Sequence, residues 1–410
     1  MRKIEYFYLR LTIVLFAVFP IIPEKIKGLP IIILSLIIVK YLSELKKNSI
    51  DIRFFLILSS IFILNLLSIF YNFSFKFPFS KIETSLSLIL IPLFFSLIMK
   101  RKEVLILKKN EFTLLFIASS SLLSIILLMY FYKLDLFSTP LKVNSFRKTV
   151  LEIPFIYAHP IYMSTYFAIS ILFIIDRIKK EMLNTKTIIL YSSSLLVLSS
   201  NLLLLSSKGV LISLIISFIF YLTISIRRKF IKYLPSLLII SSFILIIYIS
   251  PTLERRFREF TIKTTFTKFD INNSTSIRIA IYKCTLKTIK KSPFLGYGWG
   301  YSNLKLYNCY KMNNEFLYKK KFNTHNQYFS ILLNGGIVAL AVFFFFLFYI
   351  FKLSYKNKDY FFSSIIVFYL LLFLTENILE RQSGLIIFIF IISYFTFINK
   401  YNNSDKELKD

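Results

Sequence analysis

The sequence is poor in the residues that most often build metal-binding or nucleophilic sites. It contains two histidines, two cysteines and one tryptophan, and 21 acidic residues stand against 51 basic ones. Two separated histidines without any Cys/His spacing argue against a dedicated zinc site. The glycine-rich GYGWG at 296–300 has neither a predicted strand before it nor a following Lys-Ser/Thr, so no nucleotide-binding loop is indicated. We therefore expect no metal and no cofactor, and any chemistry must draw its energy from an activated substrate.

Hydrophobic residues, in contrast, are abundant. They make up 56% of the chain, and the mean hydropathy is +0.67. Apolar runs of about 18 residues recur, which is the length that indicates membrane-spanning helices. Helices are expected because backbone groups in lipid must be satisfied within the segment, and no alternating barrel pattern is present. The chain is thus predicted to be an all-α, polytopic integral membrane protein.

Twelve spans are predicted from the apolar runs, and most reach the roughly 20 residues needed to cross the hydrocarbon core. They lie at residues 4–22, 28–42, 54–71, 82–99, 112–132, 153–175, 187–206, 209–226, 231–250, 326–351, 360–378 and 382–399. The first has no small-residue cleavage site and is read as an ordinary span rather than a signal peptide. The second is short and lies between Pro23 and Pro30.

The basic residues predict the orientation. With the N-terminus in the cytoplasm, cytoplasmic segments hold 26 Lys and Arg, and the short outer loops hold 10. This bias fits the positive-inside rule. Runs such as Lys100-Arg101-Lys102 are topology anchors beside anionic headgroups, so the net charge of +30 requires no nucleic acid partner. An even number of spans places both termini in the cytoplasm.

Residues 251–325 form the one large water-facing segment, on the outer side after the ninth span. The chain is divided accordingly into nine helices over 1–250, this outer loop with short helices, and 326–410 with helices ten to twelve and a cytoplasmic tail. The loop has 15 basic and four acidic residues, and this charge of +11 predicts an anionic partner. Cys284 and Cys309 both lie in it, and they either form a disulfide worth about 3 kcal/mol or remain free thiols.

Polar residues near the outer ends of spans are candidates for function. His159, in AHPIYMSTY at 158–166, is either an interfacial histidine at a proline-bent helix start or a substrate-binding residue. Lys208 is the only charge in the short outer turn SSKGV and lies beside a helix N-terminus, where phosphate is favoured.

The outer loop itself contains a predicted helix. In SIRIAIYKCTLKTIKK the apolar residues Ile277, Ile281, Leu286 and Ile289 recur at helical spacing, after a polar start at 274–276 that can cap the helix. Arg278 falls in the first turn. A cation there is opposed by the helix dipole, which favours an anion-binding role over a purely structural one.

The order of these motifs resembles the O-antigen ligase and polymerase superfamily of bacterial envelopes. The motifs are SSKG at 206–209, STSIRIAIYKCTLKTIKKSPFLGYGWG at 274–300 and THNQYFSILLNGGIVAL at 324–340, with one large outer loop before the tenth span. HPIYMSTY at 159–166 and TENILERQSG at 375–384 also look like family features. The resemblance covers about residues 155–385, whereas the first five spans match only in hydrophobicity.

The resemblance implies a glycosyltransferase of the inner membrane, with a glycosyltransferase-C-like helical fold and an active site that faces the periplasm. Such enzymes move a glycan from an undecaprenyl pyrophosphate donor to an acceptor hydroxyl, without a nucleotide sugar or a required metal. The acceptor is lipid A core in the ligases and another lipid-linked repeat unit in the polymerases. Both reactions fit the sequence, and a teichoic-type, capsular or protein acceptor also stays open.

Three residues can be assigned roles from the family pattern. Its essential histidine falls on His325, followed by Asn326 as an expected substrate-binding residue, and the arginine of its loop helix falls on Arg278. The arginine at the turn after span seven is replaced by Lys208, which lacks the fork that binds phosphate oxygens in pairs.

The chemistry gives these residues distinct roles. Attack on an anomeric carbon needs a base for the acceptor hydroxyl and positive charge at the leaving pyrophosphate. His325 is the candidate base, since imidazole exchanges a proton near neutral pH. Arg278 and Lys208 would hold the pyrophosphate, and we expect them to converge on His325. Direct displacement would invert the anomeric configuration.

The roles of the remaining polar residues are less well defined by the sequence. Glu376, Glu380 and Arg381, at the outer end of span eleven, either contact the acceptor or pair with one another. Arg147 and Lys148, before span six, would extend the basic surface around a diphosphate. In span ten, adjacent glycines at 335–336 indicate close packing rather than substrate contact.

Two other classes of function explain the sequence less well. A flippase of lipid-linked glycan would also be polytopic and basic, but it predicts ionisable residues along a path inside the spans, whereas most charges here lie in loops or at span ends, apart from a few such as Lys40. A sensor or scaffold would leave the grouping of histidine, arginine and lysine unexplained.

Overall fold

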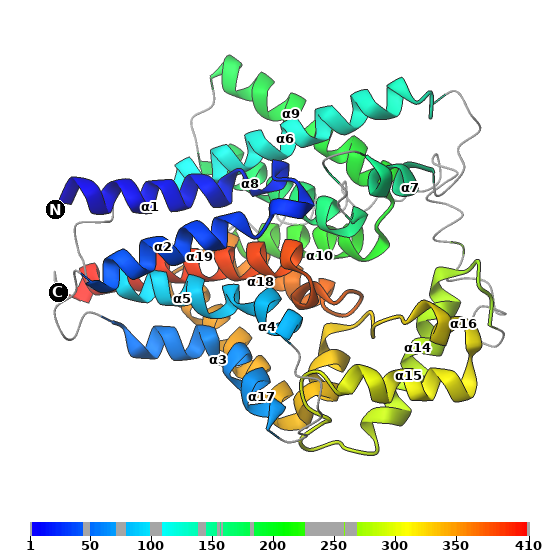
Figure 1. Cartoon of the computed structure of the whole chain (residues 1–410). Helices are drawn as coiled ribbons and strands as arrows, with labels where there is room; N and C mark the ends of the chain where they lie inside the picture. The colour runs from blue at the N-terminus through cyan, green and yellow to red at the C-terminus, as the bar shows by residue number, and fades with distance from the viewer. Residues whose placement is uncertain are drawn as a thin grey trace. The chain divides into compact units, whose positions relative to one another are not determined.

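The computed structural model is built from helices joined by turns wherever it describes the chain. The described residues are 2–43, 50–70, 79–98, 109–137, 145–153, 156, 159–180, 184–225, 258 and 269–407, and Figure 1 shows their helices in chain order. The chain divides into two compact units. Unit 1 comprises Met1–Lys40, Arg101–Phe257 and Asp359–Phe368, and unit 2 comprises Tyr41–Lys100, Arg258–Lys358 and Tyr369–Asp410.

Unit 1 is organised around α8. Its helices are α1 (Arg2–Ala17), most of α2 (Leu29–Ser43), α6 (Lys109–Lys133), α7 (Ser145–Glu152), α8 (Pro160–Lys180), α9 (Thr185–Leu205) and α10 (Lys208–Ser225). Helix α8 packs against α6, α9 and α10, and most of its residues are buried. The rings of Phe112 and Phe116 both meet Phe173 edge to face. Aromatic packing thus holds α6 against α8.

Unit 2 combines helices that come before, within and after the segment that we predicted to be an outer loop. They are α3 (Ile52–Ile69), α4 (Phe79–Ser85), α5 (Ser87–Ile98), α14 (Ser274–Ile289), α15 (Ser302–Asn313), α16 (Glu315–Lys320), α17 (Gln327–Lys356), the 3-10 turn η4 (Ile378–Glu380) and α19 (Gln382–Glu407). Helix α18 (Tyr360–Leu372) contributes residues to both units. Helices α5 and α17 each pack against α3 and α19.

Asparagine and aspartate side chains start many of the helices. Each accepts a hydrogen bond from a backbone amide in the first turn, which satisfies a group that the helix leaves unpaired. The residues are Asp51, Asn184, Asn273, Asn314 and Asn326. For α14 we predicted a cap within 274–276, and the cap is Asn273, one residue earlier.

Eight helical segments in the described residues are long and apolar enough to cross a membrane, so the expected polytopic all-α architecture is confirmed, while the number twelve is not. Helices α1 and α2, with 16 and 15 residues, and α18, with 13, are shorter than the roughly 20 residues of a full span. The predicted span 231–250 lies outside the described residues.

Two predicted spans have different boundaries. The span expected at 153–175 begins at Pro160, because proline lacks an amide hydrogen and suits the first helical position, and the separate helix α7 ends before the expected span, at Glu152. The span expected at 360–378 ends at Leu372. The chain then turns back through η4 rather than continuing as a helix.

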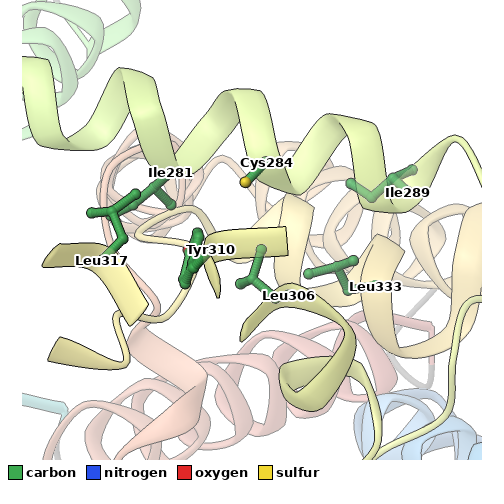
Figure 2. Packing of buried hydrophobic residues seen from close by; sticks show 7 residues of the cluster. All are labelled: Ile281, Cys284, Ile289, Leu306, Tyr310, Leu317 and Leu333. Carbon is green, nitrogen blue, oxygen red and sulfur yellow. The ribbon is translucent and has the colours of Figure 1, made fainter. Parts of the chain in front are cut away.

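The described part of the segment that we predicted to be an outer loop has its own hydrophobic core (Figure 2). Its buried members are Ile281, Cys284, Ile289, Leu306, Tyr310, Leu317 and Leu333. Leu333 belongs to α17, so the loop helices pack onto the start of that helix. Of the two alternatives for the cysteines, the disulfide is present, and Cys284–Cys309 joins α14 to α15. Leu286, predicted on the buried face of α14, is 44% exposed instead.

Helix α17 is broken at its two adjacent glycines, where Gly336 has a φ of 63°. The carbonyls of Leu333 and Asn334 accept hydrogen bonds from the amides of Tyr297 and Gly298, at 2.7 and 2.8 Å. The GYGWG turn thereby supplies the partners that the interrupted helix lacks. The predicted close packing is present, but its partner is this turn.

Glycine is required on both sides of that contact. A Cβ on Gly296 would lie 2.7 Å from the Leu333 oxygen, and one on Gly336 would lie 2.1 Å from the Phe294 oxygen. Both residues also have positive φ, which side-chain-bearing residues rarely adopt. The loop and α17 are therefore joined backbone to backbone at a fixed point.

Candidate functional site

His325 lies in a tight turn immediately before α17, and its backbone is left-handed, with a φ of 47°. Its amide donates to Asn323 Oδ1 at 3.2 Å, and the hydroxyl of Thr324 donates to the carbonyl of Asn326 at 2.8 Å. Short polar side chains of this kind stabilise turns by bonding to nearby backbone. The sequence around His325 thus specifies the turn that presents it.

Asn326 and Tyr282 hold this turn in place. Asn326 caps α17 by accepting from the Phe329 amide at 3.0 Å, and its Nδ2 donates to the Leu374 carbonyl at 3.1 Å. The Tyr282 hydroxyl lies 3.2 Å from the His325 carbonyl and 3.3 Å from that of Leu374. Both ends of the Asn326 amide are thereby engaged within the fold.

Glu376 connects the two residues that we predicted to be catalytic. Its Oε1 accepts from Arg278 Nη2 at 2.5 Å, and its Oε2 lies 3.7 Å from His325 Nδ1. The side chain of Glu376 is 11% exposed, while those of Arg278 and His325 are 28% and 27% exposed. A largely buried carboxylate therefore lies between a guanidinium and an imidazole that solvent can still reach.

The segment that carries Glu376 is joined to the histidine turn by further hydrogen bonds. The Gln327 amide donates to the Phe373 carbonyl at 2.8 Å, and the Gln327 side chain accepts from the Leu379 amide at 2.9 Å. Asn377 Nδ2 donates to Thr324 Oγ1 at 2.9 Å. These contacts explain why α18 ends early, since the residues after Leu372 bond to the start of α17 instead.

Glu380 forms the far side of this network. Its Oε1 accepts from Ser330 at 2.5 Å and from Asn377 at 2.6 Å, and its Oε2 accepts from Asn323 at 3.2 Å. Arg381 is exposed, and it makes no ion pair with either glutamate in the described structure. Of the two alternatives for these three charged residues, pairing with one another is therefore not seen in the described structure, and contact with the acceptor stays a prediction.

Burial also affects the one tyrosine of this site. It raises the pKa of Tyr282, and the Arg278 charge opposes that effect, while the Glu376 charge adds to it. Tyr282 therefore stays a neutral hydrogen-bond donor at physiological pH.

A second group of predicted residues lies in unit 1. Arg147, on α7, donates to the Leu205 carbonyl at 2.6 Å and to the Ser207 hydroxyl at 3.1 Å. Ser207 also bonds to Ser164 of α8 at 3.0 Å. Arg147 is thus bound to the turn between α9 and α10. Lys208 follows this turn directly as the first residue of α10, and its side chain is buried.

His159 directly precedes α8, as its HP dipeptide predicted. Its Nδ1 accepts from the Ile161 amide at 3.4 Å, and its ring lies edge to face on Tyr162, with centroids 5.9 Å apart. The structure therefore places His325, Arg278, Asn326 and Glu376 together in unit 2. His159, Arg147 and Lys208 belong to unit 1, so their expected convergence on His325 stays a prediction.

Several residues of the site were not singled out from the sequence. Tyr282, Thr324 and Asn377 hold the turn and the Glu376 segment through bonds between residues far apart in the chain. Thr324 and Asn377 lie inside the THNQ and TENILE motifs, so the motifs contained them without indicating their partners. Nothing in the sequence indicated a functional role for Tyr282 beyond its place on the predicted loop helix.

The geometry suits an oriented base. Glu376 Oε2 lies 3.7 Å from Nδ1, which is beyond hydrogen-bond distance, and a shift of a few tenths of an ångström would let it accept from an Nδ1 proton and leave Nε2 to accept one. The same carboxylate stabilises the imidazolium that forms. Arg278 gives one of its five N–H donors to Glu376 in the contact described, and a guanidinium can bind an anion with its other donors.

Comparison with known proteins adds one finding. Residues 193–344 match a family model described as O-Antigen ligase. The matched range includes Lys208, Arg278, His325 and the glycine break in α17. None of the curated proteins matches the chain.

Proposed function

We propose that the chain transfers a glycan from undecaprenyl pyrophosphate to an acceptor hydroxyl, and the match of residues 193–344 to the O-Antigen ligase family model supports this proposal. The single observation that supports this most is the shared carboxylate: Glu376 contacts both Arg278 and His325. A base and a cation held together by one group suit a reaction that removes a proton while a negatively charged group departs.

The proposed step is a direct displacement. The acceptor oxygen forms a bond to the anomeric carbon, and the bond from that carbon to the pyrophosphate oxygen breaks. The acceptor proton passes to His325 Nε2, and the electron pair of the broken bond stays on the pyrophosphate. Glu376 stabilises the resulting imidazolium, and Arg278 supplies positive charge for the departing oxyanion.

The other predicted residues take supporting roles. Asn326, whose amide is engaged at both ends, positions His325 by fixing the turn. Arg147 and Lys208 form a basic group at the α9–α10 turn, for which we propose binding to the donor's phosphates. His159 and Arg381 stay candidates for contact with the glycan or the acceptor.

The base assignment is tested with His325→Asn. Asparagine tolerates the left-handed backbone of this position, so the turn should survive the change. Lys321→Asn is the matched control, because Lys321 is exposed and also has a positive φ, of 50°. Transfer from lipid-linked glycan in proteoliposomes should fall by about 10²-fold or more for His325→Asn and stay unchanged in the control. Undiminished transfer by His325→Asn would remove the assignment.

The acceptor is identified with a deletion strain. Loss of all polysaccharide from lipid A core indicates an O-antigen ligase, which is the reaction we favour. A single repeat unit left on the core indicates the alternative, a polymerase that joins lipid-linked repeats. An unchanged glycan profile would contradict both. A transporter of lipid-linked glycan would instead leave the purified protein without transfer activity.

A further inference from the structure

Unit 2 contains a cavity of about 290 Å³ that the proposed chemistry does not use. Its wall is formed by α3, α4, α5, the GYGWG turn, the start of α15, the first turns of α17 and η4. The volume is near the lower end of the roughly 300–1,000 Å³ of typical ligand pockets. The cavity therefore has room for a small polar group such as one sugar ring.

Three polar side chains that line the cavity make no hydrogen bond with a described residue, and Lys81 has only a longer-range electrostatic interaction with the Glu380 carboxylate. The amine of Lys81 and the amides of Asn65 and Asn303 make no hydrogen bond with any described residue. All three are only partly exposed. Half-buried polar groups gain most from a ligand that satisfies them, since water reaches them incompletely.

Other polar groups of the wall are fixed. Asn334 accepts from the Ser302 hydroxyl at 2.6 Å, and Glu380 accepts from Ser330 and Asn377. These bonds hold the wall in one arrangement and leave Lys81, on α4, as its cation. A rigid wall with a few unengaged donors and acceptors is the arrangement that orients a polar ligand.

Trp299 adds an aromatic surface to the same wall. Its amide donates to Ser68 Oγ at 2.9 Å, and its ring meets Phe62 edge to face, with centroids 6.2 Å apart. The indole is thus held between the loop and α3. An immobile indole beside amides and hydroxyls suits a sugar, which has an apolar ring face and a polar rim.

The cavity is connected to the histidine turn. Asn323, two residues before His325, donates to the cavity-lining carboxylate of Glu380 at 3.2 Å. Gln327, two residues after it, lines the cavity directly. One short segment therefore presents the candidate base and also contributes to the cavity wall.

We propose that this cavity is a saccharide subsite, which binds one sugar ring of the glycan and uses Lys81 to bind an anionic substituent on that ring. The expectation of a glycan ligand rests on the proposed function, whereas the site itself rests on the cavity and its unengaged side chains.

Trp299 provides a direct test, because it is the only tryptophan in the chain. The detergent-solubilised full chain is titrated with D-glucuronate, D-glucose and acetate while tryptophan emission is recorded. We expect saturable binding of glucuronate, about tenfold weaker binding of glucose, and no response to acetate. Lys81→Met should abolish the preference for glucuronate, and Lys283→Met, at an exposed lysine of α14, should leave it unchanged.

Asn303→Ala provides a second variant and should weaken the binding of both sugars. Absence of saturable binding in the unaltered protein, an acetate response equal to that of glucuronate, or unchanged glucuronate preference in Lys81→Met would each overturn the subsite. Because binding is read without turnover, a negative result here is distinct from a failed transfer assay. The His325→Asn variant should still bind glucuronate, so sugar binding that persists when transfer is lost supports the subsite.

Discussion

Arg278 and Glu376 lie 98 positions apart in the chain and are joined by a hydrogen bond of 2.5 Å. The partner of the loop arginine is thus a residue just beyond the end of α18. The other oxygen of the same carboxylate faces His325. A change at Glu376 should therefore affect both proposed catalytic residues at once.

Glu376→Gln tests this coupling. The amide keeps the shape of the side chain but loses the charge that holds Arg278 and stabilises the His325 imidazolium. We expect transfer to fall by about 10²-fold, with a change in its pH profile that a merely structural role would not produce. Glu315→Gln is the control, because Glu315 is exposed and pairs with Lys319 at 2.7 Å. Equal activity and pH profiles in the two variants would contradict the role of Glu376.

The disulfide should stabilise the outer loop. Replacing both Cys284 and Cys309 by serine releases a closed loop with a sequence separation of 25, which is expected to lower the free energy of unfolding by about 3 kcal/mol. Thermal unfolding followed by Trp299 emission measures the loss. Reductant should lower the melting temperature of the unaltered protein and leave the double variant unchanged. If reductant lowered the melting temperature of both proteins by the same amount, the disulfide would not be the source of the stability that reductant removes.

Gly336→Ala should disrupt the contact between α17 and the GYGWG turn. The added Cβ would lie 2.1 Å from the Phe294 oxygen, and alanine would have to adopt a φ of 63°. The left-handed backbone alone costs about 1–2 kcal/mol, and the clash adds to it. Val338→Ala, two residues further on at a half-exposed position, is the control. A melting temperature of Gly336→Ala at or above that of Val338→Ala would contradict this account.

Stability should fall in alkaline solution. Burial raises the pKa of Tyr282, and it also raises those of Tyr307 and Tyr310. The unfolded chain releases these protons near pH 10, before the folded chain does, so the stabilisation is complete below about pH 10 and is lost as the pH rises further. The decrease of the melting temperature with pH is measured between about pH 8 and pH 12, roughly the range in which tyrosine titrates. Tyr282→Phe should make it shallower, and an unaltered slope would exclude a contribution from Tyr282.

The helices could be predicted well because long apolar runs leave few alternatives in a membrane. The errors occurred where apolar sequence continues through a break. Residues 153–175 and 360–378 are hydrophobic enough to read as single spans, but one begins only at Pro160 and the other ends at Leu372. Hydropathy does not predict the backbone hydrogen bonds that end a helix early. One such bond runs from the Gln327 amide to the Phe373 carbonyl.

The site was predicted residue by residue but not as an arrangement. His325 and Arg278 stood out through rarity and motif, and Glu376 was named as a possible contact of the acceptor. That Glu376 joins the other two depends on bringing α14 and the end of α18 together, which sequence spacing does not encode. The substrate-binding role expected for Asn326 stays a prediction, and in the structure its side chain is engaged by the Phe329 amide and the Leu374 carbonyl.

The contact between Gly296 and Gly336 has a consequence for how this chain can vary. Where two side chains pack, a larger residue on one side can be matched by a smaller one on the other. Here each missing Cβ faces the main chain of the opposite segment, and a main chain cannot be made smaller. No second substitution can compensate for the first. Engineered or natural variants should therefore tolerate exchange of whole loops only when the new loop brings its own glycine to meet Gly336.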